Sequence, residues 1–483
     1  MGPDRSIPGR DDALARELRA ALSTDRVLTG SFEKQLYARD ASTITVSAPG
    51  VVCLPVSTAE VQSCVRIARR HDRAITPRGA GTGLAGGAVP IDEPVVIVTT
   101  KMNRVLEIDV EERTAWVEPG VLNLDLTKQV THLGLHYAPD PSSQQSCSIG
   151  GNVANNSGGP HCLLHGVTSA HVLAIEVVLP DGSVVMLGGE DPDPAGYDLR
   201  GAFVGSEGTM GIATRVLVRL MPNPPEVRTL LADFGSIRDA CAAVSAIIAD
   251  GMLPAALEMM DRNCIRAVEN FAHAGLPMDA AAVLLVEVDG LIAGVDAAAA
   301  QIAAVCRSNG AGTVRVAATA EERMLLWKAR KSAFGAIANI KPNYYLHDCV
   351  VPRTRLVEVM ERVTEIVESK DLMVLNVFHA GDGNLHPLIV FDRREPGVSE
   401  RVHEAGHEII EACVAAGGML SGEHGIGLEK RDYMPLVFGA ADLEHQSRLR
   451  AIFDPDGVCN PQKVLPAGTF CGELGSIPEG AWI

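Results

Sequence analysis

Hydrophobic positions along this 483-residue chain follow two spacings, one typical of strands and one typical of amphipathic helices. Between residues 225 and 320, short apolar runs alternate with longer segments of helical spacing, two of which end at Gly251 and Gly310. This βαβ-βαβ succession predicts a mixed sheet covered by helices, in the manner of a ferredoxin-like domain. The predicted strands are 227–234, 255–259, 282–288 and 313–317, and the predicted helices are 236–250, 262–273 and 292–308.

The first half of the chain follows a different order. A short amphipathic helix is predicted at 11–22, a strand at 51–55, and a helix from the capping box Ser57-Thr-Ala-Glu60 to about residue 71. Strands follow at 94–100 and 213–220, and Pro222-Asn-Pro-Pro225 indicates a domain boundary. We therefore expect a first domain at 1–224 with its core at about 45–222, a second at 225–425, and a C-terminal segment, 426–483, that returns to the first.

A glycine-rich stretch, Pro77-Arg-Gly-Ala-Gly-Thr-Gly-Leu-Ala-Gly-Gly87, follows the predicted strand that starts near residue 73. Such a stretch leaves backbone N–H groups free to converge on an anion such as pyrophosphate. It contains Gly-x-Gly-x-x-Gly, but a Rossmann fingerprint must open a helix, and here Pro90 and a strand follow. The pattern favours a pyrophosphate loop without a Rossmann fold; the alternative is a merely flexible glycine loop.

Two further small-residue stretches lie downstream and are also predicted to be loops. The second spans Pro139 to Ser143 and Cys147 to Gly159, and the third spans Gly205 to Ile212. Three such loops within about 140 residues are typical of a site for a long, extended cofactor that is contacted mostly by backbone, as a dinucleotide is.

The most distinctive stretch is Val374 to Phe391, where two apolar runs flank Gly-Asp-Gly-Asn. Asp-Gly between such runs is a strong hairpin signal. With Asp382 and Gly383 at the turn centre, His379 and His386 are expected directly opposite each other, about 5 Å apart at Cβ. Two paired imidazoles favour a transition-metal site, and the alternative is two histidines satisfied by their neighbours.

Other candidate residues surround this hairpin in the sequence. Ser421-Gly-Glu-His-Gly425 offers a carboxylate and another imidazole on a loop. Four cations could hold a carboxylate, with Arg330 as a bidentate fork, although such a run is commonly a solvated helix face; they are Lys328, Arg330, Lys331 and Lys341.

His403-Glu-Ala-Gly-His407 matches the helical zinc-hydrolase signature. The helix predicted there buries Val402, Gly406, Ile409, Ile410 and Cys413, which directs both histidines towards its edge or solvent. We keep a zinc hydrolase only as a distant alternative.

Composition narrows the class of protein. The net charge of −18 argues against nucleic-acid binding. The 11 widely spaced cysteines contain no Cys-x-x-Cys pair, which argues against a disulfide framework and an internal iron–sulfur cluster and favours a reducing, cytoplasmic setting. The N-terminus lacks the apolar core of a signal peptide, and no segment approaches the about 20 apolar residues of a membrane span.

The glycine-rich motifs resemble those of the vanillyl-alcohol-oxidase/p-cresol-methylhydroxylase flavoprotein family. The resemblance implies an α+β protein with a two-subdomain FAD-binding fold and a ferredoxin-like substrate (cap) domain. It implies non-covalent FAD, because loop 77–87 has no histidine for a tether. The implied cofactor-binding residues are Pro77, Arg78, Gly79, Ala80, Gly81, Thr82, Gly83, Leu84, Pro139, Ser142, Cys147, Gly150, Gly151, Asn152, Gly158, Gly205, Glu207, Gly208, Ile212 and Asn460.

The histidine hairpin and the Ser-Gly-Glu-His-Gly loop extend this resemblance over about residues 45–466. They are similar to motifs of FAD-linked 2-hydroxy-acid oxidases, a group that includes glycolate oxidases and D-lactate and D-2-hydroxyglutarate dehydrogenases. The resemblance implies a divalent metal, zinc or manganese, at His379, His386 and Glu423. His424 is implied as the base and Arg330 with Lys341 as the substrate-carboxylate clamp, with hydride passing from C2 of the acid to flavin N5.

Two departures bear on the substrate. Phe334 stands where hydroxyglutarate dehydrogenases have Thr, and Leu388 stands where they have Asn. Both changes make the expected pocket less polar, which favours glycolate or D-lactate over D-2-hydroxyglutarate, the alternative. The resemblance also implies an external electron acceptor, such as a sister flavin subunit with an iron–sulfur subunit. Peripheral membrane association through these partners and the oligomeric state are left open.

Overall fold

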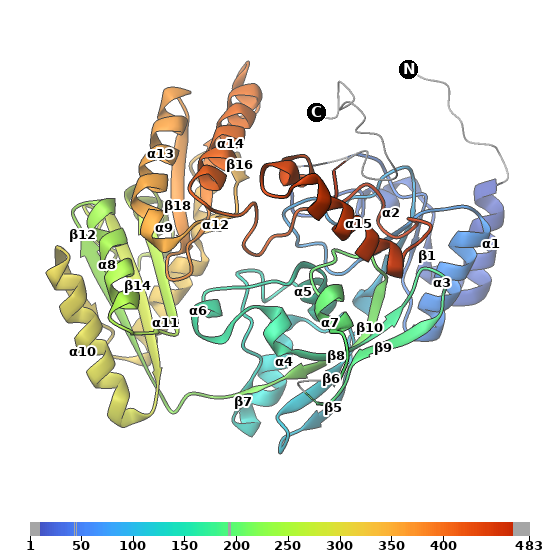
Figure 1. Cartoon of the computed structure of the whole chain (residues 1–483), viewed down its shortest axis with the longest axis horizontal. Helices are drawn as coiled ribbons and strands as arrows, with labels where there is room; N and C mark the ends of the chain where they lie inside the picture. Colours follow the sequence, from blue (N-terminus) through green and yellow to red (C-terminus); the bar gives the residue numbers. More distant parts are fainter. Residues whose placement is uncertain (1–9, 43, 45, 192–194, 467–483) are drawn as a thin grey trace. The chain divides into compact units, whose positions relative to one another are not determined.

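The structure is a computed structural model that describes residues 10–42, 44, 46–191 and 195–466. The ends of the expected domain ranges, 1–9 and 467–483, lie outside the described residues. The chain divides into two compact units (Figure 1). Unit 1 contains the residues up to Ser157, Val167–Pro222 and the residues from Glu423 on, and unit 2 contains Gly158–Gly166 and Asn223–Gly422.

Unit 1 is built on two main sheets. One has the strand order β1-β2-β4-β3 and the other the order β5-β6-β10-β8-β9, and β7 pairs with β11. Two sheets in this unit confirm the expected two-subdomain, α+β FAD-binding fold. The elements are α1 (Arg10–Leu22), β1 (Val27–Leu28), α2 (Ser31–Gln35), β2 (Val51–Cys53), α3 (Thr58–Arg70), β3 (Ile75–Arg78), β4 (Val95–Val98), β5 (Val105–Asp109), β6 (Thr114–Val117), α4 (Asn123–Val130), β7 (Leu135–His136), α5 (Ile149–Asn155), β8 (Val172–Val178), β9 (Val184–Gly188), α7 (Leu199–Phe203), β10 (Ile212–Arg219), β11 (Met221–Pro222) and α15 (Ala440–Phe453).

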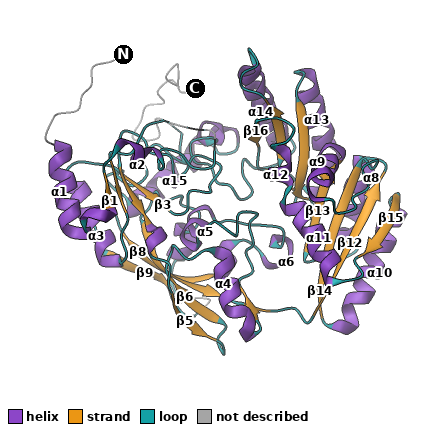
Figure 2. Ribbon diagram, turned by 180° about the vertical axis from the view of Figure 1, so that it is seen from behind, coloured by secondary structure: helices purple, strands orange, loops and turns teal. Residues whose placement is uncertain are grey.

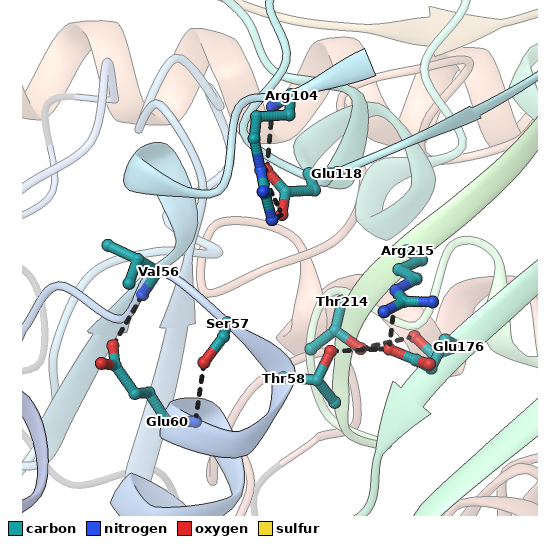
Figure 3. Close-up of polar contacts among 9 residues, drawn as sticks. All are labelled: Val56, Ser57, Thr58, Glu60, Arg104, Glu118, Glu176, Thr214 and Arg215. Atoms are coloured by element: carbon teal, nitrogen blue, oxygen red, sulfur yellow. Dashed lines mark hydrogen bonds and ion pairs between the residues drawn. The ribbon is translucent and has the colours of Figure 1, made fainter. Parts of the chain in front are cut away.

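Helix α3 links the two sheets of unit 1 through its capped N-terminus (Figure 3). The Ser57 hydroxyl accepts a hydrogen bond from the Glu60 backbone N–H, as the capping box predicts. The Glu60 carboxylate accepts instead from the Val56 backbone N–H, one residue earlier than a capping box requires. The Thr58 hydroxyl then donates to Glu176 of β8 at 2.7 Å, and Thr214 of β10 donates to the same carboxylate oxygen. The first turn of α3 is thereby fixed to the second sheet.

Unit 2 contains one large sheet with the order β15-β12-β14-β13-β18-β19-β17, and β20 pairs with β18 and β16. The order of its first four strands is that of a ferredoxin-like domain, as expected. Every strand pair in the described part of this sheet is antiparallel, so the expectation of a mixed sheet is wrong. The strands are β12 (Glu226–Phe234), β13 (Ala256–Asp261), β14 (Ala282–Gly290), β15 (Ala311–Val316), β16 (Asn343–Leu346), β17 (Cys349–Val350), β18 (Met373–His379), β19 (Asn384–Leu385) and β20 (Pro387–Phe391).

The helices of unit 2 pack on this sheet in two groups. Helix α8 contacts α10 and α13, while α9 contacts α11 and α12, and Figure 2 shows these helices beside the orange strands of the sheet. The helices are α6 (Cys162–His165), α8 (Ile237–Ala249), α9 (Arg262–Ala272), α10 (Ile292–Ser308), α11 (Ala320–Lys331), α12 (Ala333–Ile337), α13 (Leu356–Ser369) and α14 (Val398–Ala415). In the described part of the chain, no helix has both the length and the apolar character needed to cross a membrane.

Two features differ from the sequence-based expectation. The second glycine-rich stretch is not all loop, because residues 149–155 form α5, with Ser148 as a side-chain cap. Residues 158–166 lie within the first domain as predicted from the sequence, but they pack with unit 2. Their contacts there are specific: His161 pairs with Glu287 at 3.3 Å, and Leu163 lies so close to Gly381 that a Cβ at 381 would meet it at 2.4 Å.

The histidine hairpin forms, but its register differs from the one expected. His379 pairs with Asn384 and Asn376 pairs with Pro387, so the turn centre lies between Gly381 and Asp382. In this register His386 lies across from Val377, two residues from His379 along β18. The prediction that the histidines lie directly opposite each other is therefore wrong. They are diagonal neighbours on the same face, since side chains two residues apart in a strand point the same way.

Candidate active site

The glycine-rich stretches of unit 1 converge. A Cβ at Gly79 would lie 2.5 Å from the Ser148 hydroxyl, and one at Gly208 would lie 3.1 Å from the Pro77 ring. The first stretch thus meets both the second and the third without room for larger side chains. Gly81 and Gly86 adopt positive φ, which glycine tolerates without strain.

The first loop offers unused backbone donors. The N–H groups of residues 79–84 find no hydrogen-bond acceptor among the described residues. The loop is half-exposed, and the preceding Arg78 is buried, which lowers the pKa of its guanidinium from the usual value. A run of free N–H groups beside an arginine fits a pyrophosphate group, as the sequence predicts.

The C-terminal segment secures these loops. The Asn460 side-chain amide donates to the carbonyls of Gly87 at 2.9 Å and Glu207 at 2.7 Å, joining the first and third stretches. The buried Lys463 ammonium donates to the Gly87 and Val89 carbonyls and to Asn460, and burial lowers the pKa of Lys463 to about 7. Both residues hold the loops together through backbone carbonyls.

Glu207, predicted to contact the cofactor, is engaged within the protein. Its carboxylate accepts hydrogen bonds from the backbone N–H groups of Ile426 at 2.6 Å and Gly427 at 2.8 Å. Burial raises the pKa of Glu207 to about 7. Asn155 of α5 likewise donates to the His424 carbonyl at 2.8 Å, so both side chains fix the loop that follows Glu423.

The other predicted cofactor residues fall into four groups. Pro139 and Asn152 are joined through Asn123, whose amide donates to the carbonyl of one and the side chain of the other. Cys147 is buried beside Asn152, and Ile212 is a core residue that begins β10. Gly158 belongs to unit 2, apart from the rest of the set. The remaining predicted residues belong to the three glycine-rich stretches themselves and are Ala80, Thr82, Gly83, Leu84, Ser142, Gly150, Gly151 and Gly205.

In unit 2, His379 and His386 form a close pair. Their rings lie 5.1 Å apart at the centroids with planes at 82°, and a ring nitrogen of each lies within 4.8 Å of one on the other. His379 is 3 % exposed and His386 is 4 % exposed. Two buried imidazole nitrogens at this separation suit the nitrogen ligands of a zinc or manganese ion.

A carboxylate orients the first of these rings. Glu258 of β13 faces His379 across the strand pair, and its Oε1 lies 2.7 Å from His379 Nδ1. Burial by itself would raise the pKa of Glu258, but the charges of His379 and Arg330 outweigh it and hold the pKa below the usual value. The ionised carboxylate therefore accepts from Nδ1–H, and in the neutral imidazole Nε2 is the nitrogen that would bind a metal ion.

Arg330 joins this group from α11. Its Nη2 lies 2.5 Å from Glu258 Oε2, and the two side chains are 2 % and 1 % exposed. The Arg330 Nε is buried and has no hydrogen-bond partner among the described residues. Arg330 is therefore no solvated cation of a helix face, and it retains a donor for a further acceptor.

A second carboxylate stands behind His386. Asp348 Oδ1 lies 3.5 Å from His386 Nε2, and Asp348 also accepts from the Ser421 hydroxyl at 2.5 Å and the Gly422 N–H at 3.0 Å. Gly422 packs so tightly on Asn384, the strand partner of His379, that a Cβ there would meet its side chain at 2.5 Å. Glu423 follows by one peptide bond, and His424 by two.

The remaining candidates lie elsewhere. Lys341 is at the surface of unit 2, where its ammonium pairs with Glu395 at 2.7 Å, and the structure does not bring it to Arg330. On α14, His403 stacks on Tyr345 and His407 pairs with Glu411 at 3.3 Å. The five residues expected in the core of this helix are all buried, so its two histidines are on the exposed side, as expected.

Sequence reasoning missed Glu258 and Asp348. Each had a signal: Glu258 is the single charge in the apolar run Ala255-Ala-Leu-Glu-Met-Met260, and Asp348 precedes the apolar run Cys349-Val-Val351. A lone acid in a buried strand needs a partner, because burying an unpaired charge is costly. The partner could not be named without the sheet order.

Comparison with known proteins identifies the family. Residues 223–464 match the model described as "FAD linked oxidases, C-terminal domain", and residues 49–188 match the "FAD binding domain" model. The glycolate oxidase subunit GlcD of Escherichia coli K12 is 45 % identical over 429 residues, covering 89 % of this chain and 86 % of that protein. The chain belongs to the FAD-linked oxidase family.

Other relatives agree with this assignment. GlcD of Bacillus subtilis 168 is 41 % identical over 89 % of this FAD-linked oxidase and 92 % of its own length. A D-lactate dehydrogenase of Anaerostipes hadrus is 32 % identical over 92 % and 95 % of the two chains. The predicted FAD cofactor and oxidoreductase class are thus confirmed, and the hydrolase alternative loses its support.

Solved structures confirm the fold of this FAD-linked oxidase. A substrate-bound p-cresol methylhydroxylase superposes with a TM-score of 0.81 at 18 % identity, covering 96 % of this chain and 98 % of that one. A 4-ethylphenol oxidase of Gulosibacter chungangensis gives a TM-score of 0.79 at 20 % identity, over 97 % and 99 % of the chains. The fold is therefore of the vanillyl-alcohol-oxidase type expected from the glycine-rich motifs.

Proposed function

We propose that this chain oxidises a short D-2-hydroxy acid, glycolate or D-lactate, to the 2-oxo acid. The observation that carries the proposal is the buried set His379, His386, Glu258 and Arg330 on one face of the unit 2 sheet. It combines nitrogen ligands for a metal with a cation for a carboxylate, the two features that a 2-hydroxy acid presents. The similarity to glycolate oxidase subunits and a D-lactate dehydrogenase supports the same substrate class.

Each residue has a defined task in this reaction. His379, His386 and Glu423 hold a divalent metal ion, zinc or manganese, and Arg330 binds the substrate carboxylate without Lys341, which pairs with Glu395 at the surface. His424 accepts the proton of the 2-hydroxyl group, as an imidazole with a pKa near 7 can. When bound, FAD would supply a two-electron acceptor for the C2 hydride, and a metal ion would supply the positive charge that makes the hydroxyl more acidic.

FAD is held without a covalent bond by the converging stretches of unit 1, because loop 77–87 offers no histidine. The electrons then leave to an external acceptor, which we propose is a sister flavin subunit together with an iron–sulfur subunit. The curated relatives named glycolate oxidase subunit support an assembly of this kind.

Anaerobic bleaching of the flavin tests the function directly. Glycolate or D-lactate should bleach the wild-type flavin, L-lactate should not, and a chelator should suppress the reaction. His424→Ala should lose bleaching by at least about 100-fold, in line with removal of a general base, while keeping FAD and metal. Unchanged bleaching in His424→Ala would remove the assigned base, and bleaching by none of the acids would refute the function.

D-2-hydroxyglutarate remains the second candidate, because the same site would accept its first carboxylate. Leu388 argues against D-2-hydroxyglutarate as the substrate. This fully buried residue of β20 pairs with Leu375 of β18 and lies two residues from His386. The Phe334 ring lies 6.2 Å from that of Tyr344, whose strand partner is Val390. An apolar surface of this kind offers no partner for a second carboxylate.

Leu388→Asn tests this specificity. The variant should bleach more slowly with D-lactate and gain relative activity with D-2-hydroxyglutarate, by roughly 10-fold or more in the ratio of kcat/KM values, as a new polar partner would give. Leu375→Asn, a substitution at its strand partner, tests whether any buried asparagine has this effect. Wild-type enzyme that prefers D-2-hydroxyglutarate would reverse the assignment.

A further inference from the structure

Glu258 contacts two functional groups at once. One oxygen receives the Nδ1–H of His379 at 2.7 Å and the other lies 2.5 Å from the Arg330 guanidinium. All three side chains are at least 96 % buried, so water screens neither contact. One carboxylate therefore balances both the ligand and the cation of the proposed site.

We propose that Glu258 is a positioning residue that strengthens His379 as a metal ligand and restrains Arg330 as a carboxylate receptor. This inference rests on the proposed function, and it specifies how the metal and anion parts of that site are coupled.

The metal side follows from the hydrogen bond. A carboxylate on Nδ1–H fixes the ring orientation and makes Nε2 a better donor to a metal ion, and loss of such a partner typically weakens metal binding about 10- to 100-fold. The anion side follows from charge. Arg330 is neutralised by Glu258, so an incoming carboxylate meets a cation whose charge is already shared, and the unpartnered Nε is a donor available to it.

The neighbouring acid Glu287 supplies a comparable structural contact between α11 and the sheet, away from the histidine pair. This second buried acid, on β14, accepts from Trp327 of α11 at 2.6 Å and Thr229 at 2.7 Å. Trp327 precedes Arg330 by one helical turn, so Glu287 fixes α11 on the sheet without touching the histidine pair. Ala256 pairs with Glu287 and lies two residues before Glu258, so both acids lie on the same face of the sheet.

The test uses Glu258→Gln in the FAD-loaded, metal-stripped protein, with Glu287→Gln as the matched control. Zinc affinity is measured by competition with a chromophoric chelator. Carboxylate affinity is measured without metal, from the flavin absorbance change on adding 2-hydroxy-2-methylpropanoate, which has no C2 hydrogen to lose. In Glu258→Gln zinc affinity should fall about 10- to 100-fold, while carboxylate affinity should rise roughly 5-fold or more, as an unshared charge would give.

These opposite shifts separate positioning from general damage. A loss of both affinities, a loss of only one, or no change would overturn the proposal, as would the same pattern in Glu287→Gln. Arg330→Gln supplies a second variant should Glu258→Gln not fold. It leaves the Glu258 charge to His379 alone, so zinc affinity should rise and carboxylate affinity should fall; a fall in zinc affinity would contradict the proposal.

The outcome is distinguishable from failure of the proposed function. A wild-type protein that binds no zinc or manganese refutes the metal site and the role of Glu258 together. A wild-type protein that binds metal and is bleached by glycolate or D-lactate, but whose Glu258→Gln variant keeps both affinities, refutes the role of Glu258 alone.

Discussion

The two histidines of the hairpin in unit 2 each place one ring nitrogen near a buried carboxylate. His379 and His386 have acids behind them, Glu258 and Asp348, and keep their remaining ring atoms close to each other. Hydrogen bonding to neighbouring residues alone would not require the two rings to lie 5.1 Å apart on the same face of the sheet. The carboxylate-backed arrangement is the one that metal-binding histidines usually adopt.

Replacing either histidine tests this interpretation. His379→Ala and His386→Ala should each reduce bound metal to near zero and slow flavin bleaching by at least about 100-fold, equivalent to about 2.7 kcal/mol in the barrier. FAD content should be unchanged, because the cofactor stretches lie in unit 1. Metal content by elemental analysis and FAD by absorbance give the result.

The natural control is the other histidine pair of unit 2. His403→Ala and His407→Ala, on the exposed side of α14, should leave metal content and bleaching as in wild type. Metal that follows His403 and His407 instead would revive the hydrolase alternative.

The sequence predicted which types of residue form this site but not how they are arranged. Residue types and glycine spacing were enough to select His379, His386 and Arg330, which the structure does bring together through Glu258. Glu258 is 121 positions from His379, and such a long-range pair depends on strand order, which local pattern does not encode. For the same reason the surface position of Lys341 beside Glu395 could not be foreseen.

Among the elements, β18 and its hairpin show the limit of turn signals. The Asp-Gly dipeptide correctly marks the turn, yet the hairpin closes with a four-residue loop that shifts the pairing by two positions. A shift by two preserves the faces of a strand, whereas a shift by one would have turned His386 away from His379. The expected metal site thus survives an incorrect register.

Helix α5 shows the opposite case, where an expected loop is partly helical. Its start is fixed by Ser148, whose hydroxyl accepts from Gly151 N–H and also closes the space above Gly79. Glycine content alone suggested a loop, because glycine disfavours helices, but tertiary contact overrides that preference here. The element is short and its small residues let the first stretch approach.

Gly79→Ala tests this close approach. Its Cβ would lie 2.5 Å from the Ser148 hydroxyl, so the two stretches must separate, at a cost of about 1–3 kcal/mol. FAD affinity should fall roughly 5- to 150-fold, by the same arithmetic. Affinity is measured by flavin fluorescence on reconstitution of the apoprotein.

Gly189→Ala is the matched control, because a Cβ there meets nothing within 4 Å and its φ is not in the positive range. It should bind FAD as wild type does. Equal losses in both variants would mean that the effect does not come from the meeting of the two stretches.

At the scale of the whole molecule, the far end of the chain completes unit 1. Asn460 pairs through its backbone N–H with Ile75 and through its side chain with Gly87 and Glu207, which are more than 250 positions away. These bonds give a physical basis to the expectation that the segment after residue 425 returns to the first domain.

Asn460→Ala should therefore weaken the whole of unit 1. The Glu207 carbonyl loses its side-chain donor and the Gly87 carbonyl keeps only Lys463, at a cost of about 1–3 kcal/mol, and the melting temperature should fall by roughly 3–8 °C. Differential scanning calorimetry of the FAD-bound protein measures the shift, and FAD should dissociate at a lower temperature.

Gln462→Ala controls for backbone effects. Gln462 also has positive φ, at 61° against 43° for Asn460, but it is exposed, and its side-chain amide donates to Asp92 at 3.2 Å. Its melting temperature should stay within about 2 °C of wild type, the range expected of a surface change. A comparable fall in both variants would attribute the loss to the left-handed backbone.

Residues 158–166 belong to unit 2, and this limits how chimaeric versions of the enzyme can be made. His161 and Leu163 belong in sequence to the cofactor half, yet their partners Glu287 and Gly381 lie in unit 2. A chimaera that takes unit 2 from a relative must therefore carry residues 158–166 together with 223–422. If gene segments were joined only at the proline-rich boundary, contacting side chains such as His161 and Glu287 would come from two different parent proteins. The same constraint applies to natural recombination between members of the family.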